Sequence, residues 1–106
     1  MNEPELPTHA QFAENLSQIF AIQLGNEESL DITLSEVSEL RESARQERFS
    51  LLFKGPGDPF LPQQLYRMRH EKLGAFEIFL VPVGREQDDF LYEAVFNRLR
   101  RPDSTN

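Results

Sequence analysis

The chain has 106 residues, no cysteine and a net charge of −7 at pH 7. This length fits one compact domain, and the lack of cysteine excludes disulfides, thiolate metal sites and cysteine nucleophiles. The first forty residues contain eight acidic residues and no Lys or Arg. Such an acidic half repels a phosphate backbone, so we expect no nucleic-acid partner.

The sequence gives no sign of membrane targeting. No apolar run approaches the roughly 20 residues that a membrane-spanning helix needs. The N-terminal sequence MNEPELPTHAQ has neither the basic nor the apolar region of a signal peptide. We therefore expect a cytoplasmic protein without a membrane span, unless a partner carries it into an exported assembly.

A short helix is predicted near the N-terminus. Residues 1–7 are acidic and contain two prolines, which predicts a flexible lead-in. Thr8 then suits the N-cap of a helix over residues 9–16. Phe12 and Leu16 would lie one turn apart on its apolar side.

Alternating apolar and polar residues predict about six antiparallel strands after the helix. The expected strands cover residues 18–24, 30–35, 49–53, 65–70, 75–83 and 91–98. A slip in the apolar pattern at Glu36 predicts a β-bulge or a strand end there. The highly charged segment 41–48 is predicted to be a loop.

One strand has a helical alternative. Segment 63–72 can place apolar residues on one side of a helix, but a strand agrees better with the turn EKLG that follows it. The whole pattern predicts a mainly β (α+β) domain over residues 8–99, forming a meander, a small barrel or a curled sheet. Residues 100–106 are predicted to be a flexible tail.

The run GAFEIFLVPVG, residues 74–84, is the most apolar part of the chain. From Ile78 onward both of its alternating faces are apolar, which predicts a central strand covered on both sides. The same reasoning predicts that strand 18–24 is well buried. Pro82 has no N–H to donate, so pairing on one side is predicted to stop or bulge there.

The residue pattern does not point to a catalytic, metal or cofactor site. His9 and His70 lack the spacing of zinc ligands, and the chain has neither a glycine-rich phosphate loop nor a nucleophile elbow. We expect no enzyme activity, no metal and no cofactor. The remote catalytic alternative is His70 acting as a general base paired with Glu71 or Glu77.

The loop GPGDPFLPQ, residues 55–63, is a candidate for binding a protein partner. It places Phe60 and Leu61 directly after Pro59, and a stiff loop lowers the entropy cost of presenting an apolar pair. The alternative is that Phe60 plugs the open end of the sheet.

The basic C-terminal segment is the second candidate for partner binding. Arg98, Arg100 and Arg101 could contact the acidic first half of another copy, which would give a homo-oligomer. The alternative is that these charges only solubilise the protein. Either segment would serve a protein partner or self-association.

Three segments together resemble a small bacterial family of domains of unknown function. They are FSLLFKGP at 49–56, LPQQLYRMRHEKLGAFEIFLVPVG at 61–84 and YEAVFNR at 92–98. The specific part is an F-x-IFLVPVG strand followed by a YEAVFN strand, and the resemblance covers residues 12–98. It implies a mostly β fold, no established enzymatic activity and an association with phage-tail-fibre proteins.

These observations favour a non-catalytic interaction or structural domain, accessory to a tail-fibre-like or other extracellular assembly. The alternative function is a small-ligand-binding β-barrel, because nine Phe could line a cavity instead of filling it.

Overall fold

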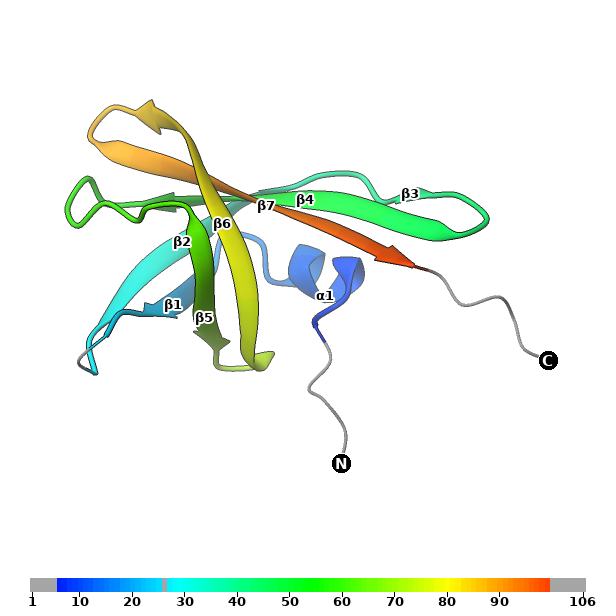
Figure 1. Ribbon diagram of the computed structural model, residues 1–106, viewed down its shortest axis with the longest axis horizontal. Helices are drawn as coiled ribbons and strands as arrows, with labels where there is room; N and C mark the ends of the chain where they lie inside the picture. The colour runs from blue at the N-terminus through cyan, green and yellow to red at the C-terminus, as the bar shows by residue number, and fades with distance from the viewer. Residues whose placement is uncertain (1–5, 26, 100–106) are drawn as a thin grey trace.

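Seven strands follow one short helix in a computed structural model that describes residues 6–25 and 27–99 (Figure 1). The elements are α1 (His9–Glu14), β1 (Ile19–Gln23), β2 (Ser29–Val37), β3 (Arg41–Glu42), β4 (Gln46–Gly55), β5 (Gln64–His70), β6 (Gly74–Glu86) and β7 (Asp89–Leu99). Paired strands are antiparallel, in the order β2-β1-β5-β6-β7-β4-β3, and β2 also pairs with β4. Six strands therefore close into a barrel, which confirms the predicted mainly β fold.

Helix α1 begins as predicted. The Thr8 hydroxyl accepts a hydrogen bond from the Gln11 N–H, and the Gln11 side chain accepts one from the Thr8 N–H. This capping box satisfies two N–H groups that have no partner within the helix. The helix ends at Glu14, earlier than predicted, and Leu16 is exposed instead of sharing the buried side with Phe12.

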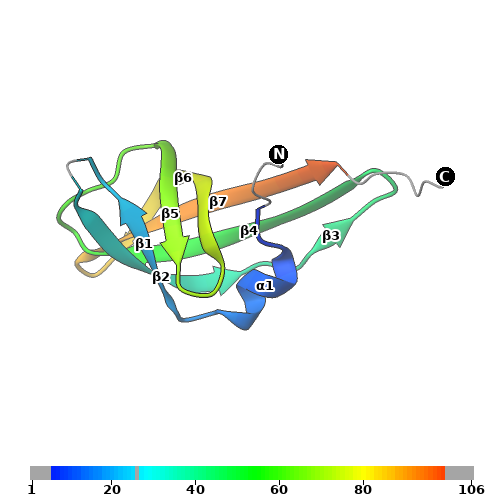
Figure 2. The ribbon, with the colours of Figure 1, turned by 90° about the horizontal axis from the view of Figure 1, so that it is seen from below.

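An arm extends from the barrel on the side of α1. It consists of β3 with the first residues of β4 and the last residues of β7, residues 46–49 and 96–99. Figure 1 shows this arm reaching to the right of the barrel with α1 beneath it, and Figure 2 shows the same arrangement from below. Helix α1 therefore packs against the arm through its buried residue, Phe12.

Phe12 joins α1 to four strands. Its ring is fully buried, and its centroid lies 5.3–6.2 Å from those of Phe20, Phe49, Phe76 and Phe96. These four rings come from β1, β4, β6 and β7. Aromatic pairs at such distances add stabilisation beyond the burial of their area, so the cluster closes the barrel end below the arm.

The prediction of a loop over residues 41–48 is wrong. Arg41 pairs with Arg48 and Glu42 with Glu47, so this segment forms β3, a tight turn and the start of β4. Both faces of this ribbon carry charged residues, as is common at a sheet edge. The segment lacks apolar alternation, which explains why β3 and the start of β4 were not predicted as strands.

The expectation that β1 and β6 are covered on both faces is also wrong. Ile19, Phe79 and Val83 are exposed. A closed barrel needs only its inner face buried, and the single helix of the described residues covers an end of the barrel, not its outer face. Apolar residues on the outer face therefore remain in contact with solvent.

Both predicted irregularities are confirmed. The β2–β4 register shifts between Leu34 and Glu36, and the β6–β7 register shifts between Pro82 and Gly84. Segment 64–70 is a strand and not a helix. Local residue chemistry was sufficient for these three features.

The barrel interior is tightly packed around Gly55. A Cβ atom built on Gly55 would lie 2.8 Å from Ile32 Cγ2 and 3.4 Å from Tyr92 Cε2. Both neighbouring side chains are buried and cannot move into solvent. At this point the interior has no space for one additional methyl group.

The Gly55→Ala variant should be less stable by about 1–3 kcal/mol, because the added methyl group overpacks the interior. Urea denaturation followed by circular dichroism measures the change. Gly25→Ala is the matched control, since a Cβ there meets no atom within 4 Å, and its free energy of unfolding should stay within about 0.5 kcal/mol of wild type. Equal stability of both variants would show that the interior has room.

Candidate functional site

The β4–β5 loop separates the predicted apolar pair. Leu61 is only 2% exposed, and its N–H donates a hydrogen bond to the Tyr92 hydroxyl at 3.0 Å. Phe60 is 47% exposed, and its ring meets Phe90 edge-on with 4.9 Å between centroids. Pro59 is exposed. Leu61 is therefore a core residue that cannot reach a partner, and Phe60 rests against the end of the barrel.

The basic C-terminal segment is described only in part. Arg98 is half-buried on β7 and lies directly opposite Glu47 of β4. Arg100 and Arg101 lie outside the described residues. The one described arginine of this group thus faces an acidic residue of its own chain, and the structure does not bring it near the β4–β5 loop, which is at the other end of β4.

Both ring nitrogens of His70 are engaged in hydrogen bonds. Nδ1 accepts from the backbone N–H groups of Lys72 at 3.1 Å and Leu73 at 3.2 Å. Backbone N–H groups only donate, so Nδ1 is unprotonated, and Nε2–H donates to Gln18 Oε1 at 2.9 Å. The buried ring also lies 4.4 Å from the Phe20 ring, between centroids. His70 therefore holds the β5–β6 turn closed.

This environment favours the neutral imidazole. Burial lowers the pKa of His70 below its ordinary value of 6.5; the Glu71 carboxylate opposes this more weakly, and the Lys72 ammonium adds to it. Glu77, the other suggested partner, lies on the outer face opposite Arg67. A depression of about 360 Å³ adjoins His70, but no ring nitrogen is left to act as a base there.

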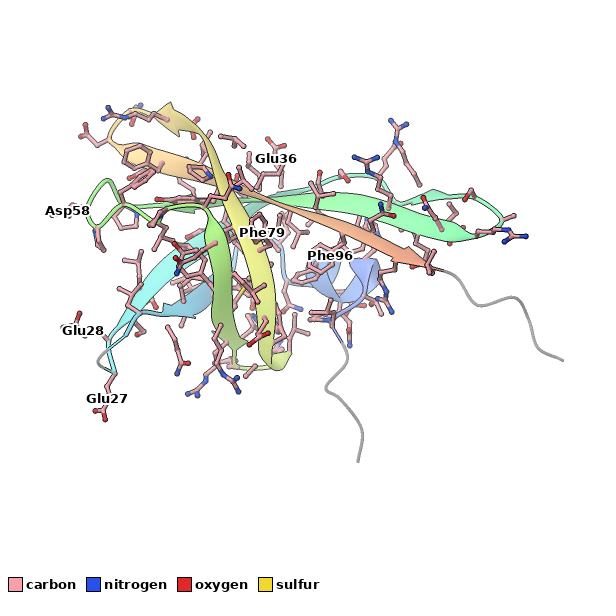
Figure 3. The ribbon with its side chains drawn as sticks, in the orientation of Figure 1. Glu27, Glu28, Glu36, Asp58, Phe79 and Phe96 are labelled. Carbon is pink, nitrogen blue, oxygen red and sulfur yellow. The ribbon has the colours of Figure 1, made fainter. Side chains whose placement is uncertain are left out.

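A stripe of exposed apolar side chains crosses the outer face of β5, β6 and β7. Leu65 and Phe79 lie directly opposite each other in register and are 56% and 47% exposed. Val95 on β7 is 52% exposed and lines the same groove as both. We call Leu65, Phe79 and Val95 the apolar stripe. Figure 3 labels Phe79 of this stripe and Phe96, which instead packs against Phe12.

The groove exists because β6 and β7 separate. Their register runs from Glu86↔Asp89 to Val81↔Glu93, and beyond this pair β6 pairs only with β5 and β7 only with β4 among the described strands. Figure 1 shows the two strands diverging. The groove has a volume of about 260 Å³ and is also lined by Leu6. The strand separation thus creates an apolar opening on the surface.

Sequence reasoning missed this stripe. It assigned Phe79 to a covered face, and it sought partner contacts on a loop and the C-terminal segment. A usable signal was present, because Leu65 shares its alternating face with Arg67, and Phe79 shares its own with Glu77. A face that carries charged residues contacts water, so its apolar members should have been expected on the surface.

A metal-binding cluster and a membrane-spanning helix are both absent from residues 6–25 and 27–99. That part of the chain has no group of three or more His, Asp or Glu placed to hold a metal ion. Its helix is too short and too polar to cross a membrane.

Tyr92→Phe should lower the free energy of unfolding by about 1–2 kcal/mol, because the buried Leu61 N–H loses its acceptor. Tyr66→Phe is the matched control: its hydroxyl donates to the carbonyl of the exposed Pro62, which water can reach. The control should lose less. Urea denaturation compares the variants, and a larger loss for Tyr66→Phe would contradict this account of the loop.

Acid should destabilise the protein through His70. Its pKa is lower in the folded state than in the unfolded state, so the stabilisation is fully present above pH 6.5 and is lost as pH falls from 6.5 through the folded-state pKa. Urea midpoints at about pH 7.5 and about pH 5 measure the loss. His70→Gln should be less stable at the higher pH and lose less between the two. A loss equal to that of wild type would exclude His70 as the cause.

Neither the curated proteins nor the solved structures compared with this chain give a match. A family model described as Domain of unknown function (DUF6916) matches residues 7–96. This range contains α1, β1 to β6 and most of β7, together with all three residues of the apolar stripe. The chain therefore belongs to the family described as Domain of unknown function (DUF6916).

Proposed function

We propose that this domain is a non-catalytic interaction domain that binds another polypeptide through the apolar stripe. The observation that carries the proposal is the exposure of Leu65, Phe79 and Val95 around one groove. Single exposed apolar residues are common, but a contiguous group beside a groove is typical of binding surfaces. Covering the exposed half of each side chain would contribute on the order of 1 kcal/mol per residue.

The packing of the interior favours this function over a ligand-binding barrel. Phe20, Phe53 and Tyr92 are fully buried inside the barrel, and Gly55 has no room for a methyl group. These rings fill the barrel where a ligand would have to sit. Binding is therefore assigned to the outer surface.

The hydrogen bonds of His70 favour a non-catalytic role in the same way. A general base needs a ring nitrogen that can accept a substrate proton, and both nitrogens of His70 are engaged with Gln18, Lys72 and Leu73. The imidazole is used to hold a turn.

The finer parts of the proposal rest on the sequence resemblance, apart from the cellular location, which rests on the residue pattern of the chain. They are a bacterial origin, a cytoplasmic location before assembly, and an accessory role in a tail-fibre-like or other extracellular assembly. An exposed apolar surface agrees with such a role, since assembly components bury surfaces of this kind on their partners.

Site-specific photo-crosslinking tests the interaction. A photoreactive amino acid replaces Phe79 in the protein produced in its native cells, and adducts are separated by mass and identified by mass spectrometry. Position 79 should give one defined polypeptide adduct. Asp31, exposed on β2 away from the stripe, is the control position and should give none. Identical results at the two positions would refute the proposed binding surface.

A second variant tests whether the adduct depends on the apolar stripe. With the photoreactive amino acid at Leu65, the substitution Phe79→Ser should remove the adduct, because the two side chains are direct neighbours across β5 and β6. Phe79→Ser changes an exposed position, so the free energy of unfolding should stay within about 0.5 kcal/mol of wild type. An adduct that survives Phe79→Ser would show that Phe79 does not contribute to binding.

A further inference from the structure

An acidic row lies on the outer face beside the apolar stripe. Glu36 of β2 and Glu93 of β7 are both directly opposite Leu52 of β4, so the three side chains share the outer face. Among the described residues, neither glutamate forms a salt bridge; Lys54 and Glu86, at the far end of β4, form one. This row therefore presents two negative charges to the solvent.

A basic row lies on the same face nearer the arm. Arg41 of β3 is directly opposite Arg48 of β4, and neither forms a salt bridge within residues 6–25 and 27–99. Like charges directly opposite each other destabilise a strand pair. The exposed Glu39 lies nearby in sequence but is not within ion-pair distance of either arginine. An acidic surface brought from outside would relieve this repulsion.

Between the two rows lies the pair Ser50 and Val95, which are directly opposite each other on β4 and β7. Arg48 and Leu52 are four residues apart on β4, which separates the rows by about 13 Å. A hollow of about 430 Å³ extends over this face. It is lined by Ser38, Glu39, Arg41, Arg48, Phe49, Ser50, Glu93 and Val95.

This arrangement is complementary to itself. A two-fold axis that lies in the plane of the face and crosses the strands along the row of Ser50 and Val95 brings two copies face to face and exchanges the two rows. The basic row of one copy then lies over the acidic row of the other, and the reverse contact forms at the same time. Closed two-fold pairs of this kind use the same surface on both copies.

The same rotation also gives the apolar stripe a place to bind. Along the strand order, Phe79 on β6 lies on the opposite side of Val95 from Ser50 and Ser38. The axis runs across the sheet along this row, so the apolar stripe of one copy lies over the apolar stripe of the other. The exposed ring of Phe79 is then covered by the stripe of the second copy.

We infer that the occupant of this surface is a second copy of the chain, bound about this two-fold axis. The inference rests on the proposed function and names its partner. The charged rows select the orientation of the two copies, and the apolar stripe with Leu52 supplies the buried centre.

Charge reversal tests the inference by size-exclusion chromatography with light scattering. Wild type should run at twice the chain mass of 12.3 kDa. Arg48→Glu and Glu93→Arg should each weaken self-association by about tenfold or more, because each places like charges across the axis. An equimolar mixture of the two variants should recover the dimer, because every contact between one variant and the other is again of opposite sign.

Lys54→Glu is the matched control. It makes the same charge change on the same strand but lies outside both rows, beside Glu86. This variant should remain a dimer. Circular dichroism shows whether each variant is folded, and the variant carrying both Arg48→Glu and Glu93→Arg should also dimerise.

Two results would overturn the inference. One is wild-type protein that stays monomeric at about 100 µM and low salt. The other is a mixture of folded Arg48→Glu and Glu93→Arg that stays monomeric. The crosslink at position 79 separates this failure from that of the proposed function: an adduct with a different polypeptide keeps the interaction domain and rejects the second copy, whereas the absence of any adduct rejects both.

Discussion

The burial of Phe12 under the arm is the contact on which the barrel depends. Backbone pairing between β6 and β7 ends at Val81↔Glu93. Beyond this pair, toward Phe76 on β6 and Phe96 on β7, hydrogen bonds between the two strands cannot close the barrel. Side-chain packing closes it instead, because the Phe12 ring contacts Phe76 of β6 and Phe96 of β7 at once. The capping box of α1 sets where the helix begins and thereby directs this ring inward.

The separation of β6 and β7 also connects the fold to its proposed role. If these strands paired along their full length, the groove beside Phe79 and Val95 would be closed by the sheet. Because they diverge, β7 continues with β4 into the arm, and the arm provides the surface on which the charged rows lie. Helix, groove and charged face therefore follow from one break in a ladder of hydrogen bonds.

Features that depend on a few neighbouring residues could be predicted from the sequence. The Thr8 cap, the irregularity at Pro82 and the β5 strand belong to this group. Features that depend on the closed barrel could not. β6 is apolar on both faces, so its pattern did not show which face the barrel would bury, and the prolines around Phe60 and Leu61 did not show which of the two turns inward.

The irregularity between Pro82 and Gly84 adds one residue, Val83, to β6 relative to β7. Pairing of β6 with β5 ends at Leu80, so β7 is the neighbour on both sides of the irregularity: Pro82 lies opposite Tyr92, and Gly84 lies opposite Leu91. Val83 is therefore the additional residue of a β-bulge, and a bulge bends the strand that carries it and increases its twist. Deleting Val83 would consequently leave a regular ladder, without the local bend that comes just before β6 separates from β7 at Val81.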